Sequence, residues 1–166
     1  MQASIPARPA PRPLSAEEQR IRDQISEELI ETLVRGFYAK VRADDLIGPV
    51  FNARIAEWEP HLQKMFAFWS SVTLGTGRYE GAPMRQHINL PVDNTHFDRW
   101  LALFEQTAQE VFPPEVAEYF IARAWRIAAS FEMGIAAKRG ELLPTRQRPW
   151  TPTQGLSAQG TPGQSI

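Results

Sequence analysis

The chain contains only three histidines, and two of them stand where they could support metal chemistry. His61 begins a stripe that continues through Met65, Phe68 and Val72, all on one face of a predicted helix. His87 lies in the segment MRQHINLP, between a glycine-containing loop and a proline. A neutral imidazole binds metals through either ring nitrogen. However, the stripe is also typical of a helical core, and a histidine at the end of a short helix often serves as a cap.

Tyrosine and tryptophan side chains near these segments add hydrogen-bond donors. Tyr38 lies in GFYAKV, and Trp100 lies in HFDRWLALF. Each could equally be a buried aromatic residue whose polar atom is satisfied within the core. We expect the third histidine, His96, to bind solvent or backbone at the start of its helix.

The composition excludes several classes of protein. The 166 residues are 43% hydrophobic and 22% charged, with a net charge of −1, as expected of a globular protein with one core. The absence of cysteine excludes disulfides, zinc–thiolate sites, iron–sulfur clusters and covalent attachment of haem. Without a basic cluster or a long apolar stretch, the sequence predicts no nucleic-acid partner, no membrane association and a cytoplasmic location.

Hydrophobic spacing predicts an all-α fold of about six helices, without an alternating strand pattern. Ser15 and Glu18 form a capping box at the start, and Ser26 could divide the first helical segment in two. Gly48 and Pro49 predict a corner within 44–52 that a helix cannot run through. The other expected helices cover 58–75, 83–89, 92–112 and 115–138.

The predicted folded domain covers residues 15–143, and both flanking segments are predicted to be disordered. Residues 1–14 hold four prolines, and residues 144–166 are rich in Pro, Gly, Gln, Ser and Thr. Such segments have too little apolar surface to form a core. Trp150 is the exception, because it could pack back onto the domain.

Three segments together resemble the group III truncated haemoglobins: GFYAKVRADDLIGPVFNARI, FAFWSSVTLGTGRYEGAPMRQHINLP and HFDRWLALFEQT. The resemblance covers about residues 30–135, and the chain, like that group, lacks glycine pairs. It implies a truncated globin, a two-on-two helical sandwich around haem b and its iron. It also implies that His87, in the pattern P-x-x-x-H-x-x-L-P, is the proximal iron ligand.

The same resemblance implies roles for the remaining candidates. Tyr38, His61 and Trp100 match the polar groups on the distal side, where a ligand of the iron binds. Lys64 matches a position where the family often has a basic residue near a haem propionate. The positions that match residues lining the haem pocket are Phe51, Met65, Phe68 and Trp69.

The three polar groups that match the distal side predict a function. Bound O₂ carries partial negative charge, which Tyr38, Trp100 and His61 would stabilise by donating hydrogen bonds. We therefore expect tight binding of O₂ and slow release, with nitric oxide, carbon monoxide and peroxide as further ligands. This favours redox or detoxification chemistry, either nitric oxide dioxygenase-like or peroxidase-like, in a monomer served by an unidentified reductase.

Two other functions stay open from the sequence. The first is a diatomic gas sensor or an oxygen-transport carrier without turnover, for which the terminal segments could supply a partner interface. The second is a helical interaction module that never binds haem.

Overall fold

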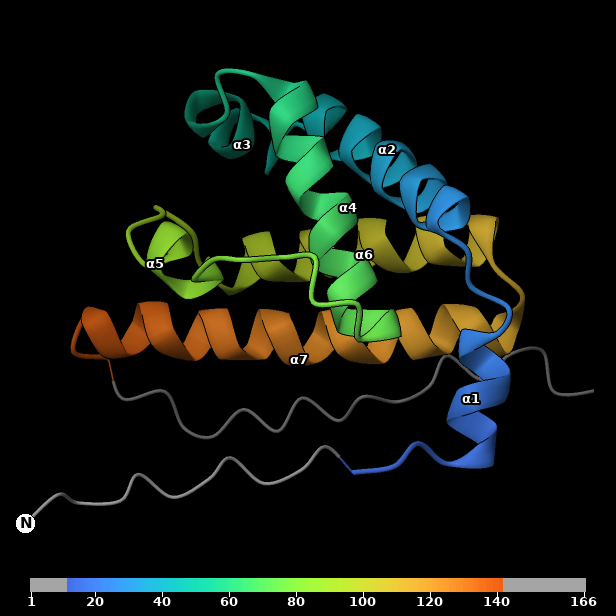
Figure 1. The fold of residues 1–166 in the computed structure, drawn as a ribbon. Helices are drawn as coiled ribbons and strands as arrows, with labels where there is room; N and C mark the ends of the chain where they lie inside the picture. The colour runs from blue at the N-terminus through green and yellow to red at the C-terminus, as the bar shows by residue number, and fades with distance from the viewer. Residues whose placement is uncertain (1–11, 142–166) are drawn as a thin grey trace, which may run out of the picture.

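The computed structural model describes residues 12–141, and these form seven helices joined by short segments (Figure 1). Within that range there is no strand, as the sequence predicts. Helices α2 and α4 pack together and cross over an antiparallel pair, α6 and α7, with α2 in contact with α6 (Figure 1). The helices are α1 (Ala16–Arg22), α2 (Glu27–Ala43), α3 (Gly48–Arg54), α4 (Trp58–Leu74), α5 (Pro83–His87), α6 (Asn94–Val111) and α7 (Pro114–Lys138).

The first helical segment is divided where the sequence offered a break. The predicted capping box of Ser15 and Glu18 opens α1. Ser26 then caps α2, because its side chain accepts a hydrogen bond from the backbone N–H of Leu29. This division gives α1 and α2 in place of one long helix.

The corner at 44–52 ends α2, as predicted, but it also contains the start of α3, which the prediction omitted. Pro49 is the second residue of α3. A proline in the first turn lacks only an N–H that would have no partner within the helix, so it permits a new helix while preventing a continuing one. The described residues therefore hold seven helices instead of the expected six or so.

The remaining boundaries follow local signals in the sequence. Gly75 ends α4 in the left-handed conformation, with φ of 68°. Pro83 and Pro114 are the first residues of α5 and α7. Asp93 caps α6, since its carboxylate accepts from the backbone N–H groups of Thr95 and His96.

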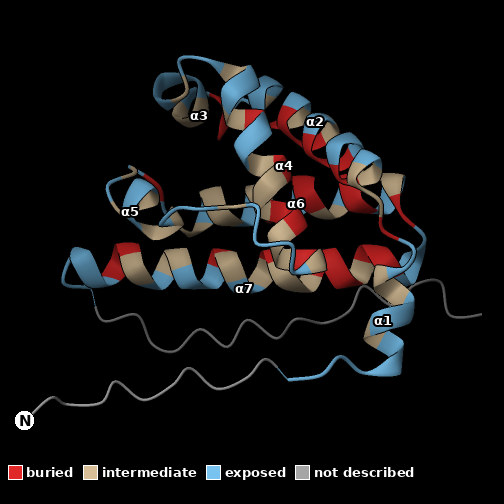
Figure 2. Cartoon of the chain, viewed as in Figure 1, coloured by how far each residue is buried: buried red, intermediate tan, exposed pale blue. Residues whose placement is uncertain are grey.

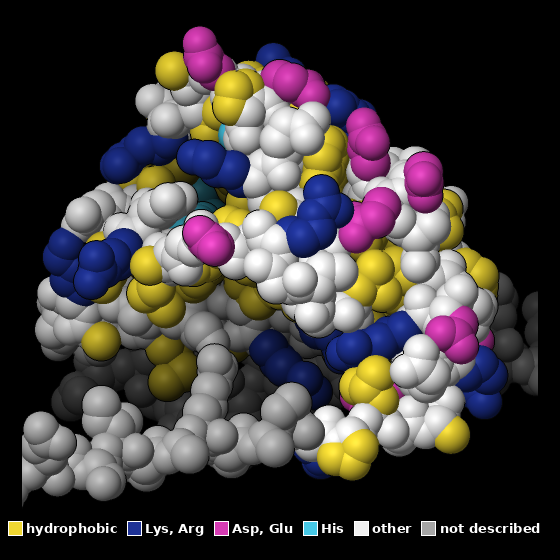
Figure 3. All heavy atoms as spheres, in the orientation of Figure 1, with side chains coloured by type: hydrophobic (Ala, Val, Ile, Leu, Met, Phe, Trp, Pro, Cys, Tyr) yellow, Lys and Arg dark blue, Asp and Glu magenta, His cyan; other side chains and the backbone are white. Residues whose placement is uncertain are grey.

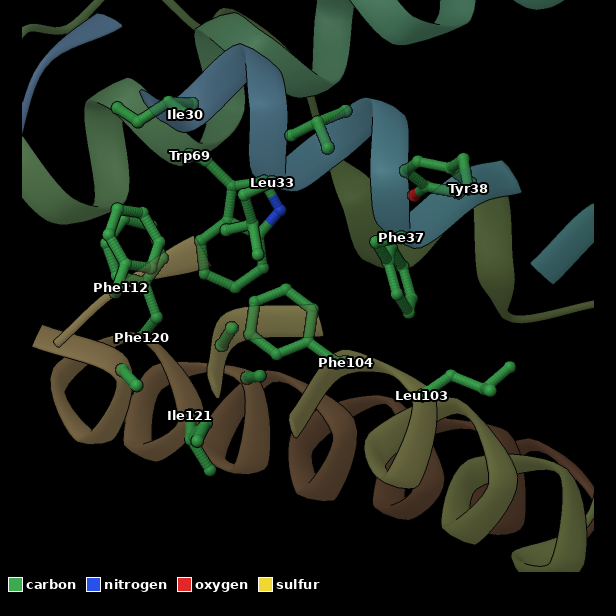
Figure 4. Packing of buried hydrophobic residues seen from close by; sticks show 14 of the residues in the cluster. Ile30, Leu33, Phe37, Tyr38, Trp69, Leu103, Phe104, Phe112, Phe120 and Ile121 are labelled. Atoms are coloured by element: carbon green, nitrogen blue, oxygen red, sulfur yellow. The ribbon is translucent and has the colours of Figure 1, made fainter. Parts of the chain in front are cut away.

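The buried residues gather where the two helix pairs face each other (Figure 2). Phe37 of α2 and Phe104 of α6 are each only 1% exposed, and their rings meet edge to face. Trp69 of α4 stacks on Phe104, with ring centroids 4.8 Å apart (Figure 4). Large aromatic side chains therefore join α2, α4 and α6 into one core.

Most of the two predicted disordered segments, and Trp150 with them, lie outside the described residues. Residues 12–14 are described and are not helical. None of the helices in the described part has the length and apolar character needed to traverse a lipid bilayer.

Candidate functional site

A mostly apolar pocket lies between the two helix pairs, and its empty volume, open mouth included, is about 970 Å³. In the space-filling view, histidine atoms are visible within a hollow that has Lys and Arg side chains near its rim (Figure 3). Eight of the nine predicted site residues line this pocket. They are Tyr38, Phe51, His61, Met65, Phe68, Trp69, His87 and Trp100.

His87 is held with one ring nitrogen available to a metal. Its Nδ1 lies 2.6 Å from the carbonyl oxygen of Pro83, one turn earlier in α5. A carbonyl can only accept a hydrogen bond, so in the neutral ring Nδ1 carries the proton and Nε2 keeps its lone pair. This is the arrangement that orients metal-binding histidines in general. Half-buried His87 is therefore chemically suited to bind iron.

His61 presents an unsatisfied nitrogen in the same pocket. Its Nε2 is the single buried side-chain nitrogen or oxygen in the described part of the chain without a hydrogen-bond partner. Tyr38 and Trp58 each meet the imidazole edge to face, with ring centroids 5.2 and 5.8 Å away. Burial lowers the pKa of His61 below its ordinary value of 6.5, and the charges of His87 and Lys64 lower it further. The imidazole is therefore neutral at neutral pH.

Tyr38 and Trp100 bring two further polar groups to the pocket from α2 and α6. Tyr38 is 5% exposed, and burial raises the pKa of its hydroxyl far above the ordinary value. The hydroxyl therefore stays protonated and able to donate. Trp100 stacks on Phe104 and meets Phe37 edge to face, so the main core fixes the indole.

These features fit a haem. The group needs an apolar slot, one neutral imidazole for its iron, and polar groups that face a ligand. The pocket has an apolar lining, His87 offers Nε2, and the buried Nε2 of His61 has no partner within the described residues. In that same part of the chain, no three His, Cys, Asp or Glu side chains form a metal site, and one imidazole is enough for haem.

Comparison with known proteins agrees with this geometry. The family model of bacterial-like globins matches residues 22–130. The chain is 37% identical over 115 residues to the group 3 truncated haemoglobin of Campylobacter jejuni, which covers 66% of this chain and 91% of that protein. The chain belongs to the group III truncated haemoglobins.

Solved structures support the same assignment. The crystal structure of the Campylobacter jejuni group III truncated haemoglobin matches with a TM-score of 0.63 and 36% identity, over 67% of this chain and 91% of that one. The truncated oxygen-avid haemoglobin of Bacillus subtilis matches with a TM-score of 0.60 and 25% identity, over 67% and 97%. The all-α truncated globin fold is therefore confirmed, in a family of haem proteins that bind diatomic ligands.

Lys64 is the one predicted site residue that does not line the pocket of this globin. It is exposed on α4, three residues after His61. The charge of Lys64 still lowers the pKa of His61, so its ammonium group lies near the site. This position at the outside of the pocket is compatible with a contact to a charged group at the mouth.

Several lining residues were not predicted from the sequence. Tyr79 belongs to the loop after α4, Phe97 to α6, and Ile127 and Phe131 to α7. Apolar residues recur along the whole of α7, so the sequence pattern does not distinguish the residues that line the pocket from those that belong to the core. A signal was available for Tyr79, which is an aromatic residue in a loop that is otherwise polar and glycine-rich.

The loop that carries Tyr79 is fixed to α4 and α2. The backbone N–H of Tyr79 donates to Ser71 Oγ at 2.9 Å, and the Tyr79 ring meets Phe68 edge to face. Arg78 pairs with Glu27 at the start of α2, at 2.9 Å. The hydroxyl of fully buried Ser70 donates to the same carboxylate at 2.7 Å. These bonds hold the loop across one wall of the pocket.

His96 lines the pocket too, but its Nδ1 is engaged at the start of α6. Nδ1 lies 3.0 Å from the carboxylate of Asp93 and 3.2 Å from the Asp93 backbone N–H. The prediction that His96 binds solvent or backbone at the helix start is confirmed for the backbone.

Proposed function

We propose that this globin binds haem b in the pocket, with His87 Nε2 as the iron ligand and with Tyr38, His61 and Trp100 as the groups that face a bound ligand. One observation carries the proposal: the buried Nε2 of His61, which has no hydrogen-bond partner among residues 12–141, shares an apolar pocket with the oriented imidazole of His87. A buried nitrogen without a partner is costly unless something in the pocket meets it. Iron held there would supply binding of O₂, nitric oxide, carbon monoxide or peroxide.

The other lining residues have simpler roles in this proposal. Phe51, Met65, Phe68 and Trp69 would exclude water and supply apolar contacts to the haem. Low polarity around the site strengthens every hydrogen bond made within it. Lys64, outside the lining, would pair with a haem propionate at the mouth of the pocket.

The polar groups define the chemistry that the pocket favours. Tyr38 donates from a hydroxyl that burial keeps protonated, and neutral His61 can hold or release one proton at Nε2. Trp100 can only donate, through its indole N–H. Each donated bond slows ligand release by roughly tenfold, at about 1–2 kcal/mol. Slow release favours redox or detoxification chemistry of O₂, nitric oxide or peroxide, supported by a reductase, over oxygen transport.

The related Bacillus subtilis protein is described as oxygen-avid, in agreement with this reading. A gas sensor or carrier is the alternative. A sensor would need a partner and a carrier would need fast release of O₂, and the experiment below distinguishes both from redox chemistry.

The test is a visible absorption spectrum of the purified full-length protein, reduced, with and without carbon monoxide. We expect a Soret band that moves when carbon monoxide is added, and that is lost or altered in His87→Ala. His96→Ala is the matched control, because His96 also lines the pocket but is engaged at the start of α6. It should keep the wild-type band.

Three results would count against the proposal. Folded protein that takes up no haem would exclude the cofactor and leave the helical interaction module. An unchanged spectrum in His87→Ala would exclude that residue as the ligand. Haem binding with fast O₂ release, and no consumption of nitric oxide or peroxide under reducing conditions, would favour the sensor or carrier.

A further inference from the structure

Helix α5 carries His87 but has little packing of its own to fix it. The helix has five residues, and none of them is buried. A helix of that length is not stable in isolation. The orientation of the imidazole must therefore depend on contacts with other parts of the chain, and the strongest of these lead to the C-terminal half of α7.

Phe131 of α7 covers one face of the imidazole. The two rings are nearly parallel, 17° apart, and their centroids are 4.4 Å apart. The hydrogen bond from Nδ1 to the Pro83 carbonyl fixes one edge of the His87 ring but leaves rotation about that bond open. A flat phenyl face restricts the rotation, because stacking favours parallel rings. The two contacts together define the plane of the imidazole.

Gly134 lets α5 approach α7 closely enough for this stacking. A Cβ atom at Gly134 would lie 2.6 Å from Sδ and 3.0 Å from Cε of Met84. Residues three apart share a helix face, so Gly134 lies beside Phe131. The Met84 side chain therefore packs directly against the backbone of α7. Met84 lies three residues before His87 in the sequence.

The end of α7 adds two contacts to the segment that follows α5. The guanidinium of Arg139 donates to the carbonyl oxygen of Leu90 at 3.1 Å, and the ammonium of Lys138 donates to the Asn89 side chain. The segment around His87 is therefore held from Met84 to Leu90 by one region of α7.

We propose that Phe131, with the space left by Gly134, is a positioning residue that sets the plane of the His87 imidazole and thereby the strength of its bond to iron. The inference rests on the proposed function, because it requires His87 to be the iron ligand. The lone pair of Nε2 lies in the ring plane, so rotation of the ring changes its overlap with a metal. Groups that orient a ligating histidine commonly tune the metal in this way.

The test compares Phe131→Leu with Phe131→Tyr in the full-length, haem-loaded protein. Leucine keeps most of the apolar volume and removes the flat face, whereas tyrosine keeps the face. The first readout is the iron–histidine stretching band in the resonance Raman spectrum of the ferrous protein. The second is the rate of haem transfer to an apomyoglobin acceptor.

We expect Phe131→Leu to shift or broaden the iron–histidine band and to speed haem loss by roughly two- to tenfold, the factor that matches the energy of one aromatic pair. Phe131→Tyr should restore both values. Phe68→Leu is the matched control, because that ring lines the pocket but has Trp69 and Tyr79 as its ring partners. It should affect haem loss without moving the band.

An unchanged band in Phe131→Leu, with haem retained, overturns the inference and leaves the proposed function intact. A wild-type protein without an iron–histidine band overturns both. Gly134→Ala gives a second route if Phe131→Leu does not fold. It should move the same band by displacing Met84, and Met84→Ala added to it should restore the band by removing the clash. No shift in Gly134→Ala counts against the inference as well.

Discussion

Tyr38 and Trp100 stand on long helices whose inner faces form the main core, whereas His87 stands on a five-residue helix that buries none of its own side chains. Phe37, next to Tyr38 in the sequence, contacts the rings of both Tyr38 and Trp100. The Tyr38 hydroxyl and the Trp100 indole therefore take their positions from packing that holds the whole molecule together. The His87 imidazole takes its position from a few contacts with α7, which can change without unfolding the core.

The largest expected effect is a loss of stability when the core that positions Tyr38 and Trp100 is disrupted. Phe104 is 1% exposed and contacts the rings of Phe37, Trp69 and Trp100. Phe104→Ala should lower the free energy of unfolding by about 3–5 kcal/mol, because a large cavity remains. Urea unfolding followed by circular dichroism measures this.

Met84→Ala, on the helix that carries His87, is the variant to compare with Phe104→Ala in the same unfolding experiment. Half-buried Met84 packs at the backbone of Gly134, and its truncation should cost only about 1 kcal/mol. Equal costs for Phe104→Ala and Met84→Ala would remove the distinction between the two sides.

The second prediction separates ligand binding from stability on the distal side. Tyr38→Phe should speed O₂ dissociation by roughly tenfold, since one donated bond is lost, and Trp100→Phe should act in the same direction. Stopped-flow mixing of the oxygenated protein with carbon monoxide measures the rate.

Tyr119→Phe is a matched control for Tyr38→Phe. The Tyr119 hydroxyl donates to the Thr73 carbonyl at 3.0 Å and accepts from Arg22, and it does not line the pocket. Tyr119→Phe should lower the free energy of unfolding by about 1 kcal/mol and leave the rate of O₂ dissociation unchanged. An unchanged rate in both Tyr38→Phe and Trp100→Phe would mean that these groups do not face the ligand.

The third prediction concerns the pH dependence that His61 gives to stability. Its pKa is lower in the folded protein than its ordinary 6.5, so below pH 6.5 the unfolded chain binds more protons. Stability should therefore be complete above pH 6.5 and decrease as the pH falls toward the folded pKa. Urea unfolding between pH 8 and pH 5 measures this change.

His61→Leu should reduce that decrease and add about 1 kcal/mol of stability at pH 8, because the unsatisfied Nε2 is gone. A variant that keeps the full wild-type pH dependence would assign it to other groups. The same variant should also change the rate of O₂ dissociation. That result would connect the stability cost of the His61 imidazole to ligand binding.

The smallest expected effect on stability concerns the contacts between the His87 segment and the end of α7. Arg139→Ala removes the hydrogen bond to the Leu90 carbonyl and should cost less than about 1 kcal/mol. Hydrogen exchange should nevertheless become faster at the amides of Ile88 and Leu90, while amides of α2 and α6 stay protected.

Arg35→Ala is the control, because Arg35 is also exposed and pairs with Glu31 of α2 and Glu59 of α4, away from α5 in the sequence. It should leave exchange in α5 unchanged. Faster exchange throughout the chain in Arg139→Ala would mean that α5 and the core open together.

The sequence predicted what depends on local signals. The capping box at Ser15 and the break at Ser26 are set by residues within one turn of each boundary, and the sequence indicated both. The short helix α3 was missed because a proline ends one helix and can begin the next, and the sequence alone does not distinguish the two.

Long-range pairing explains the parts of the site that were not predicted. Phe131 and His87 are 44 positions apart in the sequence, and only the packing of α5 on α7 brings their rings together. The spacing on α4 placed His61, Met65 and Phe68 on one side correctly, but the same periodicity could not show that Lys64 stays outside the pocket. The resemblance to a known family supplied roles that periodicity alone did not give.

The two prolines around His87 bear on the contrast between the two sides of the pocket. Pro83 begins α5 and Pro91 follows the segment, so two of nine φ angles are fixed by covalent rings before the chain folds. Restriction of this kind reduces the conformational entropy that the segment loses on folding. Ordering the segment against α7 therefore costs less conformational entropy. A few packed contacts are then enough to hold a helix that is too short to be stable in isolation.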